Sequence, residues 1–269
     1  MKIRAYITHK QRECNADCQD RFCINNENRT IAVSDGMSQS IFQEYWAELL
    51  VKYYVDNGHC SEEDRQTLCD KWLQRVESYK AEQEANGRNP WRLKNCIAER
   101  SGAGATICGV QFINDTDWKG EVLGDSCIVK VDMKTWTMEL LSSEEKVFDN
   151  HPDYYDSFPE KKGSGTVKHF EGKISHDDLL LLVSDPFSDF FLTHQTDCKK
   201  FIEQVLLLNS HDDFLRLVDN WREQGMHNDD STLCVIEFDS CPDFNISYQD
   251  SIEKLIDEET HYTMSLKNQ

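Results

Sequence analysis

Aspartates recur at the ends of the apolar runs that are expected to form β-strands. In chain order they are Asp20, Asp35, Asp125, Asp185, Asp229 and Asp230. Asp35, for example, directly follows the run RTIAVS, and Asp185 directly follows DLLLLVS. Aspartate is unfavourable inside a strand and favourable in a turn, so each of these residues, taken alone, is equally well explained as an ordinary turn residue.

Taken together, the carboxylates indicate a metal site. Strand ends that are distant in the sequence lie side by side at the edge of a sheet, and carboxylates gathered there repel one another unless they are protonated or bound to metal. Oxygen ligands without histidine or thiolate favour Mg²⁺ or Mn²⁺ over zinc or copper. Water held between two such ions becomes a nucleophile at neutral pH, which suits attack on a phosphate ester.

The elements that would position these residues follow an α+β order. Alternating or continuous apolar runs predict strands at 4–9, 21–25, 29–34, 105–114, 121–132, 135–142, 166–175, 177–184 and 231–238. Apolar residues at helical spacing predict helices at 41–57, 61–86, 198–209 and 212–224. Strands and helices do not alternate as in a doubly wound sheet. The order predicts antiparallel sheets flanked by helices in a layered sandwich.

Two segments fall outside this pattern. Residues 144–165 are polar, contain Pro152 and Pro159 and end in glycines, which is typical of a long surface loop that carries function. Residues 241–269 form an acidic tail with weak helical character. We therefore expect one domain over residues 1–240, followed by this tail.

The amino-acid composition limits which binding partners and which cellular compartment are expected. The net charge of −20 disfavours binding to nucleic acid or to an anionic membrane surface. No run of about 18 apolar residues exists to span a bilayer, and the first residues lack the apolar core of a secretion signal, so we expect a cytoplasmic protein. The eleven cysteines show no CxxC or Cys/His spacing, which predicts reduced thiols rather than a zinc site or a disulfide framework.

The motifs around the aspartates resemble, in order and approximate spacing, those of type-2C metal-dependent serine/threonine phosphatases. The motifs are CQDRF, VSDGMS, GAT at 104–106, GDS at 124–126, LLLVSDPFSD and DDSTLCVI. The resemblance covers about residues 1–240 and points to a divergent bacterial branch of that family. It implies a four-layer α-β-β-α sandwich, in which two antiparallel sheets are flanked by helix pairs, with a binuclear metal centre at one end.

The resemblance also implies roles for the motif residues. Asp35 would bridge two Mn²⁺ or Mg²⁺ ions, and the carbonyl of Gly36 would bind one of them. Asp185 and Asp229 would hold the first ion, while Asp20 would orient metal-bound water.

A third, weaker ion is bound in many members of the family. The matching positions here are Asp125 and Asp189, so two or three ions per chain are expected.

Several positions depart from the family pattern. Gln19 replaces a glutamate that in many members acts through metal-bound water, and Pro186 replaces the usual glycine after Asp185. Met37 and Ser38 follow Asp35-Gly36, so the histidine proposed as general acid in eukaryotic members is absent.

The arginine that usually binds the substrate phosphate is Asn15 in this chain. His9, Lys10 and Arg12 are the candidate substitutes, since a guanidinium binds phosphate through two hydrogen bonds and a lysine acts as a point charge. The alternative explanation is that these three are exposed, solubilising charges.

The resemblance implies hydrolysis of phosphoserine and phosphothreonine on proteins by a metal-bridging water, in signalling, with a cognate serine/threonine kinase as a further partner. The alternative is a pseudophosphatase, weak or inactive, that acts as a binding or regulatory module; the missing phosphate arginine and the unusual SDP motif favour it. A third hypothesis has the metal only stabilising the fold.

Overall fold

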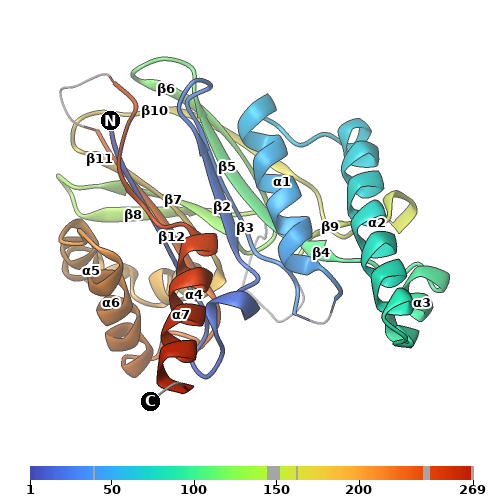
Figure 1. The fold of residues 1–269 in the computed structure, drawn as a ribbon. Coiled ribbons are helices and arrows are strands. Elements are labelled where there is room, and N and C mark those ends of the chain that lie inside the picture. The colour runs from blue at the N-terminus through green and yellow to red at the C-terminus, as the bar shows by residue number, and fades with distance from the viewer. Residues whose placement is uncertain (39, 144–151, 162, 239–242, 268–269) are drawn as a thin grey trace.

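Two β-sheets lie face to face in the computed structural model, and helices cover both outer faces (Figure 1). The structure describes the chain except for residues 39, 144–151, 162, 239–242 and 268–269. The first sheet has the order β13 (Asn245–Gln249), β1 (Lys2–Thr8), β12 (Ser231–Glu237), β11 (Asp178–Val183), β7 (Cys127–Asp132) and β8 (Thr137–Leu141). The second has the order β10 (Lys168–Lys173), β6 (Asp117–Leu123), β5 (Ile107–Phe112), β3 (Thr30–Ser34) and β2 (Arg21–Asn25).

The pairing within the sheets is antiparallel apart from one pair. β13 runs parallel to β1, whereas the other neighbouring strands of both sheets are antiparallel. A short ladder joins β4 (Gly104–Ala105) to β9 (Tyr155–Asp156). The predicted α+β sandwich of antiparallel sheets between helices is therefore confirmed.

The helices form two outer layers. α1 (Gln43–Asn57), α2 (Glu62–Ala85) and α3 (Trp91–Ala98) lie on the side of the five-stranded sheet. α4 (Asp185–Thr193), α5 (Cys198–Leu206) and α6 (His211–Glu223) cover the six-stranded sheet. α7 (Ile252–Lys267) ends the chain, and 3₁₀ turns occupy Asn15–Asp17, Pro159–Lys161 and Gln195–Asp197.

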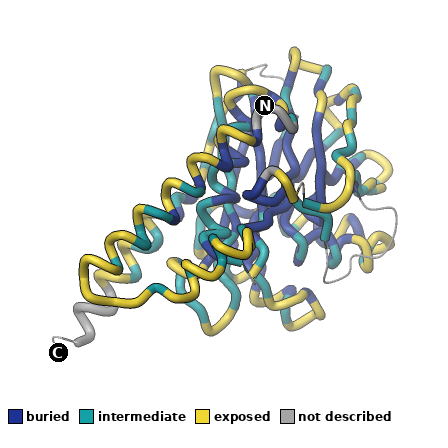
Figure 2. Tube along the Cα trace, turned by 90° about the vertical axis from the view of Figure 1, so that its right-hand side faces the viewer, coloured by how far each residue is buried: buried dark blue, intermediate teal, exposed yellow. Residues whose placement is uncertain are grey.

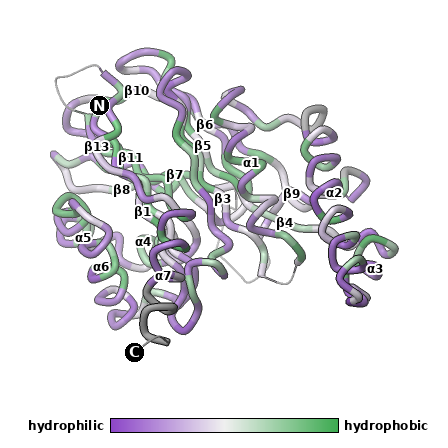
Figure 3. Tube along the Cα trace, in the orientation of Figure 1, coloured by the Kyte–Doolittle hydropathy of each residue, from purple (hydrophilic) through white to green (hydrophobic). Residues whose placement is uncertain are grey.

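Side-chain alternation along the strands divides the core into layers. On β11, Leu179 and Leu181 pack against α4–α6, whereas Leu180 and Leu182 pack between the sheets. Because successive residues of a strand point to opposite faces, a strand buried on both faces must be apolar throughout, which explains the run DLLLLV. Figure 2 shows this buried interior, and Figure 3 shows hydrophobic residues gathered along the strands.

Several elements were not predicted from the sequence, among them α4, α3 and β13. α4 begins at Asp185, and Pro186 lies in its first turn, where the missing N–H costs nothing, so the proline starts a helix rather than only stiffening a turn. α3 has no fully buried residue, and β13 alternates exposed and half-buried residues, so both apolar patterns are short: Leu93, Cys96 and Ile97 on α3, and Ile246 and Tyr248 on β13.

The segment 144–165 differs from the expected surface loop. Its first eight residues lie outside the described part of the chain. Among the described ones, Tyr155 and Phe158 are buried in the core beside Trp72, and Tyr155 belongs to β9. Two core aromatics within a polar stretch have no periodicity that sequence patterns could detect.

The region after residue 240 is also more than a tail. β13 extends the six-stranded sheet, and Ile252, Leu255 and Ile256 of α7 pack against Ile7 and Cys18. The helical character predicted for this region corresponds to α7, while the domain boundary itself stays a prediction.

Two general features of the described residues complete the fold. None of the cysteines that the structure describes forms a disulfide. No described helix combines the length and apolarity that crossing a bilayer would require.

Candidate metal centre

Five of the predicted aspartates converge where the two sheets end. Burial raises the pKa of the Asp35 carboxyl, and the charges of Asp20, Asp185, Asp125 and Asp229 raise it further, in that order. Asp20 and Asp35 adjoin strands of the five-stranded sheet, whereas Asp185 and Asp229 adjoin strands of the six-stranded sheet. The cluster therefore spans the seam between the sheets.

Asp20 is completely buried just before β2. Its Oδ2 accepts a hydrogen bond of 2.8 Å from the hydroxyl of Thr232, while its Oδ1 has no hydrogen-bond partner among the described residues. Burial raises the pKa of Asp20 to about 7, with the charge of Asp230 as the next cause. One carboxylate oxygen is thus fixed and the other is left to bind a ligand.

Asp35 is held through its backbone. Its N–H donates to the hydroxyl of Thr106 (3.1 Å), and its carbonyl accepts from the N–H of Thr106 (2.9 Å). The same hydroxyl lies 2.7 Å from that of Ser126, so the GAT and GDS motifs together fix the end of β3.

The packing around position 36 leaves no room for a side chain. A Cβ at this position would lie 2.9 Å from the carbonyl oxygen of Gln43 and 3.1 Å from that of Gln19. Because both atoms belong to the backbone, they cannot yield as a flexible side chain would. The close approach explains the glycine after Asp35.

Asp185 is the first residue of α4, directly after β11. Its Oδ1 is buried and has no hydrogen-bond partner within the described part of the chain. Burial raises its pKa well above the ordinary value, and the charges of Asp125, Asp229 and Asp20 add to the shift. The hydroxyl of the preceding Ser184 accepts from the N–H of Thr232 (2.9 Å), which joins α4 to β12.

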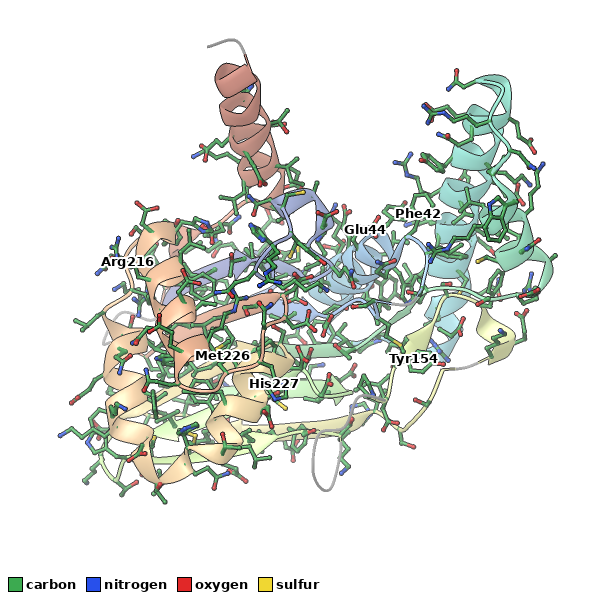
Figure 4. All side chains as sticks on the ribbon, turned by 90° about the horizontal axis from the view of Figure 1, so that it is seen from below. Phe42, Glu44, Tyr154, Arg216, Met226 and His227 are labelled. Carbon is green, nitrogen blue, oxygen red and sulfur yellow. The ribbon has the colours of Figure 1, made fainter. Side chains whose placement is uncertain are left out.

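The two predicted ligands of a third ion differ in their surroundings. Asp125 is buried in the turn between β6 and β7, and its carbonyl accepts from the hydroxyl of Ser188 on α4 (2.8 Å). Asp189 lies one helical turn after Asp185, and its Oδ2 is 3.4 Å from Nε2 of the exposed His227. Figure 4 shows His227 on the loop that precedes β12.

Asp229 is the most exposed member of the cluster, with 44% of its side chain accessible. Its Oδ1 lies 3.6 Å from Nζ of Lys10. Burial lowers the pKa of Lys10, but the charges of Asp229, Asp230 and Glu13 outweigh this and raise it overall. Lys10 is therefore a firmly protonated cation beside the cluster.

The other candidate phosphate ligands lie differently. The Nδ1 of His9 donates to the carbonyl of Lys10 (2.8 Å), and Arg12 is exposed and forms no ion pair with a described residue. Asn15 donates its N–H to Glu259 of α7 (2.8 Å). Of the three substitutes predicted for the phosphate arginine, the structure brings Lys10 to the carboxylates.

Sequence patterns gave no role to two residues that hold this region together. The carboxylate of buried Asp230 accepts from the N–H groups of Lys10 (2.9 Å) and Gln19 (2.7 Å). Nη2 of the largely buried Arg222 donates to the carbonyls of Asp229 (2.8 Å) and His9 (3.3 Å). Asp230 could have been identified from the sequence because it is adjacent to Asp229. Arg222 is a lone arginine near the end of α6, and no sequence feature indicates its role.

The chemistry of these side chains fits hard divalent cations. Within the described residues, no three His, Cys, Asp or Glu side chains are already grouped so that they could hold a metal ion. The aspartates nevertheless raise one another's pKa, and Asp20 and Asp185 each keep a buried oxygen without a described hydrogen-bond partner. Buried like charges need a compensating cation, and carboxylate oxygens are the ligands that Mg²⁺ and Mn²⁺ prefer.

Solved bacterial phosphatases are similar to this chain in structure. The serine/threonine phosphatase Stp1 from Staphylococcus aureus matches with a TM-score of 0.57 and 15% identity, over 88% of this chain and 95% of its own. The Mycobacterium tuberculosis serine/threonine phosphatase PstP/Ppp matches with a TM-score of 0.52 and 15% identity, over 88% and 98%. The S. agalactiae serine/threonine phosphatase matches with a TM-score of 0.53 and 15% identity, over 88% and 99%.

The similarity to known proteins is detected in structure and not in sequence. No model of a known protein family matches the chain, and no curated protein matches it in sequence. Structural likeness at about 15% identity concerns the fold alone. It confirms the fold that the motif resemblance implies.

Proposed function

We propose that this chain, which has the fold of bacterial serine/threonine phosphatases, hydrolyses phosphoserine and phosphothreonine on proteins with two or three Mn²⁺ or Mg²⁺ ions. The observation that carries the proposal is the convergence of Asp20, Asp35, Asp125, Asp185 and Asp229 from separate segments. The fold alone, without such a cluster, would be equally compatible with a protein that serves only as a scaffold. The substrate would be a protein phosphorylated by a serine/threonine kinase in the cytoplasm.

The residues that would hold the ions follow from the cluster. Asp35 and the carbonyl of Gly36 would bind ions from the side of the five-stranded sheet, and Asp185 and Asp229 would complete the first site from the six-stranded sheet. Asp125, with Asp189, would serve a further ion. Bound ions would supply charge that stabilises the phosphoryl oxygens and would lower the pKa of water.

The chain's own groups would handle the proton and the phosphate. Thr232 fixes Oδ2 of Asp20, so Oδ1 would accept a hydrogen bond from the attacking water and orient it. Nζ of Lys10 would hold a phosphate oxygen as a point charge. Asp230 and Arg222 would act as positioning residues, because they fix the backbone of Lys10 and Asp229.

Turnover of p-nitrophenyl phosphate and of a phosphothreonine peptide with Mn²⁺ tests the proposal. We expect Asp35→Asn and Asp185→Asn each to lower turnover by at least about 100-fold. Even the loss of a residue that only hydrogen-bonds to a metal ligand lowers metal affinity or activity by about 10–100-fold. Asp117→Asn is the matched control, because Asp117 on β6 pairs with Lys173 on β10, outside the cluster. Equal turnover of all four proteins would refute the assignment.

A pseudophosphatase is the second candidate function, and the surroundings of Asp229 favour it. Lys10 already neutralises Asp229, and the backbone N–H of Asn15, at the position of the family's phosphate arginine, donates to Glu259 of α7. Mn²⁺ that raises the melting temperature without any turnover would select this function. Turnover that depends on Asp35 would exclude it.

A further inference from the structure

A groove of about 600 Å³ is lined by the segment that follows Asp35 and Gly36, and the backbone of Gln43 in that segment lies next to Gly36. One wall is formed by the described residues of 38–44, the loop and first helical turn that follow Asp35 and Gly36. The other wall is formed by Tyr79 of α2 and by Arg92 and Leu93 of α3. The groove therefore lies between the segment that follows Asp35 and the α2–α3 hairpin.

The α2–α3 hairpin projects from the body of the molecule. Figure 2 shows its outer part exposed, and the residues of α3 include no buried one. In Figure 4, which views the molecule from below, the hairpin and α7 extend to the same side, and Phe42 and Glu44 lie between them. α2 packs into the core through Leu68, Trp72 and Val76, whereas Arg92 on the outer part of the hairpin stays exposed and can contact a partner.

Two aromatic rings and one arginine, Arg92, line the groove, and a second arginine, Arg75, lies next to the ring of Phe42. The rings of Phe42 and Tyr79 meet edge to face with centroids 5.3 Å apart, and the guanidinium of Arg75 lies 6.0 Å from the ring centre of Phe42. Arg92 is exposed and forms no ion pair with any residue that the structure describes. In a chain of net charge −20, two such arginines beside an aromatic pair form an unusual surface.

The occupant that these features fit is a peptide segment. Phe42 and Tyr79 offer flat apolar surface on which an apolar side chain can pack, and Arg75 and Arg92 offer charge that attracts carboxylates. Glu44 is the acidic residue of the lining, and it stands on the opposite wall, in the first turn of α1. The preference for acid therefore belongs to the hairpin wall.

We infer that the groove binds the segment next to the phosphorylated residue of a protein substrate, and that it selects segments with an acidic and an apolar residue. The inference rests on the proposed phosphatase function, because the groove continues from the loop that holds Asp35. It assigns the α2–α3 hairpin a role in substrate selection.

Two phosphothreonine peptides that differ only in their flanks test the inference. One carries Glu and Phe beside the phosphothreonine, and the other carries Lys and Ser. We expect the ratio of kcat/KM for the first to that for the second to fall about tenfold in Arg92→Glu and in Arg75→Glu, since like charges brought together at an interface are strongly unfavourable. Arg88→Glu, on the same hairpin but outside the groove, should keep the ratio of the unmodified protein.

Each outcome decides the matter. An unchanged ratio in Arg92→Glu and Arg75→Glu, or an equal fall in Arg88→Glu, would overturn the inference. If p-nitrophenyl phosphate is not hydrolysed with Mn²⁺, the phosphatase function fails instead. Fluorescence anisotropy of the labelled acidic peptide then still tests the groove: weaker binding by Arg92→Glu and Arg75→Glu, but not by Arg88→Glu, supports it, and equal binding by all proteins overturns it.

Discussion

The buried carboxylates are the residues whose charged form is least favourable in the folded protein. Asp20 is fully buried, and burial raises its pKa to about 7, so this carboxyl binds a proton near neutral pH far more readily than an exposed aspartate does. Lys10 is the nearby side chain that offsets this charge, and it contacts Asp229 at the exposed end of the cluster. The interior carboxylates Asp20, Asp35 and Asp185 thus depend on protons or on metal ions.

The stability of the metal-free protein should therefore fall with rising pH. Asp20 binds its proton more tightly in the folded state (pKa about 7) than in the unfolded chain (ordinary value 3.8), so folding is favoured at low pH and this contribution is lost as the pH rises through 7. Between these two pKa values, the free energy of unfolding falls by up to about 1.4 kcal/mol per pH unit. Urea unfolding in EDTA at about pH 5.5 and about pH 8 measures it, because ordinary carboxyls titrate below this range.

Two comparisons make the pH prediction specific. Asp20→Asn has no proton to lose at this position, so its decline between the two pH values should be smaller. Saturating Mn²⁺ should also flatten the profile and raise stability, since an ion that binds only the folded state stabilises it by mass action. A metal-free protein equally stable at both pH values would contradict the raised pKa of Asp20.

At the scale of elements, turns position the ligands. The turn between β6 and β7 places Asp125, and it depends on Gly124, whose φ of 95° lies in the left-handed region. A Cβ at this position would lie 2.5 Å from the carbonyl oxygen of Asp153. The glycine is therefore required both by the backbone conformation and by the close approach of a second segment.

Gly124→Ala should destabilise the protein by roughly 3 kcal/mol, since left-handed strain of about 1–2 kcal/mol and overpacking of about 1–3 kcal/mol combine. Gly225→Ala is the matched control, because Gly225 has a similar φ of 104° but no atom within 4 Å of its Cβ position. It should show the strain alone. Urea denaturation of both variants gives the two values, and equal losses would show that the contact with Asp153 is unimportant.

At the scale of the whole molecule, the end of the chain supports the loop at its beginning. Asp250 accepts from the N–H of Ile7 (3.0 Å) and lies 2.9 Å from Nδ1 of His211, while Glu259 accepts from the N–H of Asn15. Ile252 packs against Ile7. β13 and α7 therefore join β1, α6 and the loop that carries Lys10 into one unit.

Removal of residues 244–269 should destabilise the protein by at least about 3 kcal/mol, because a fully buried aliphatic side chain contributes about 1.5–3 kcal/mol and lost hydrogen bonds add to this. We also expect weaker Mn²⁺ binding, since Lys10 and Asp20 flank the loop that loses its support. Isothermal titration and thermal unfolding measure both effects. A shorter truncation after residue 261, which keeps Ile252 and Glu259, should behave like the full chain; equal behaviour of the long truncation would show that β13 and α7 are a dispensable tail.

The amino-acid sequence by itself determined most of the layers and the chemical type of the site. Period-two and helical patterns predicted the long strands and α1, α2, α5 and α6, because burial on one or both faces imposes such patterns locally. Aspartates after strands indicated hard oxygen ligands, because that preference depends on residue type alone. Short elements with little burial, such as α3 and β13, carry only two or three apolar residues at the required spacing, which is too short a pattern to identify them.

The tertiary structure decided which groups meet. Lys10 rather than His9 or Arg12 lies beside the carboxylates because its backbone N–H binds Asp230, 220 residues further along the chain. The roles of Arg222 and α7, and the groove between α1 and the α2–α3 hairpin, likewise depend on contacts between distant segments. Local periodicity cannot predict such contacts, because the register and packing that create them are set only when the whole chain is folded.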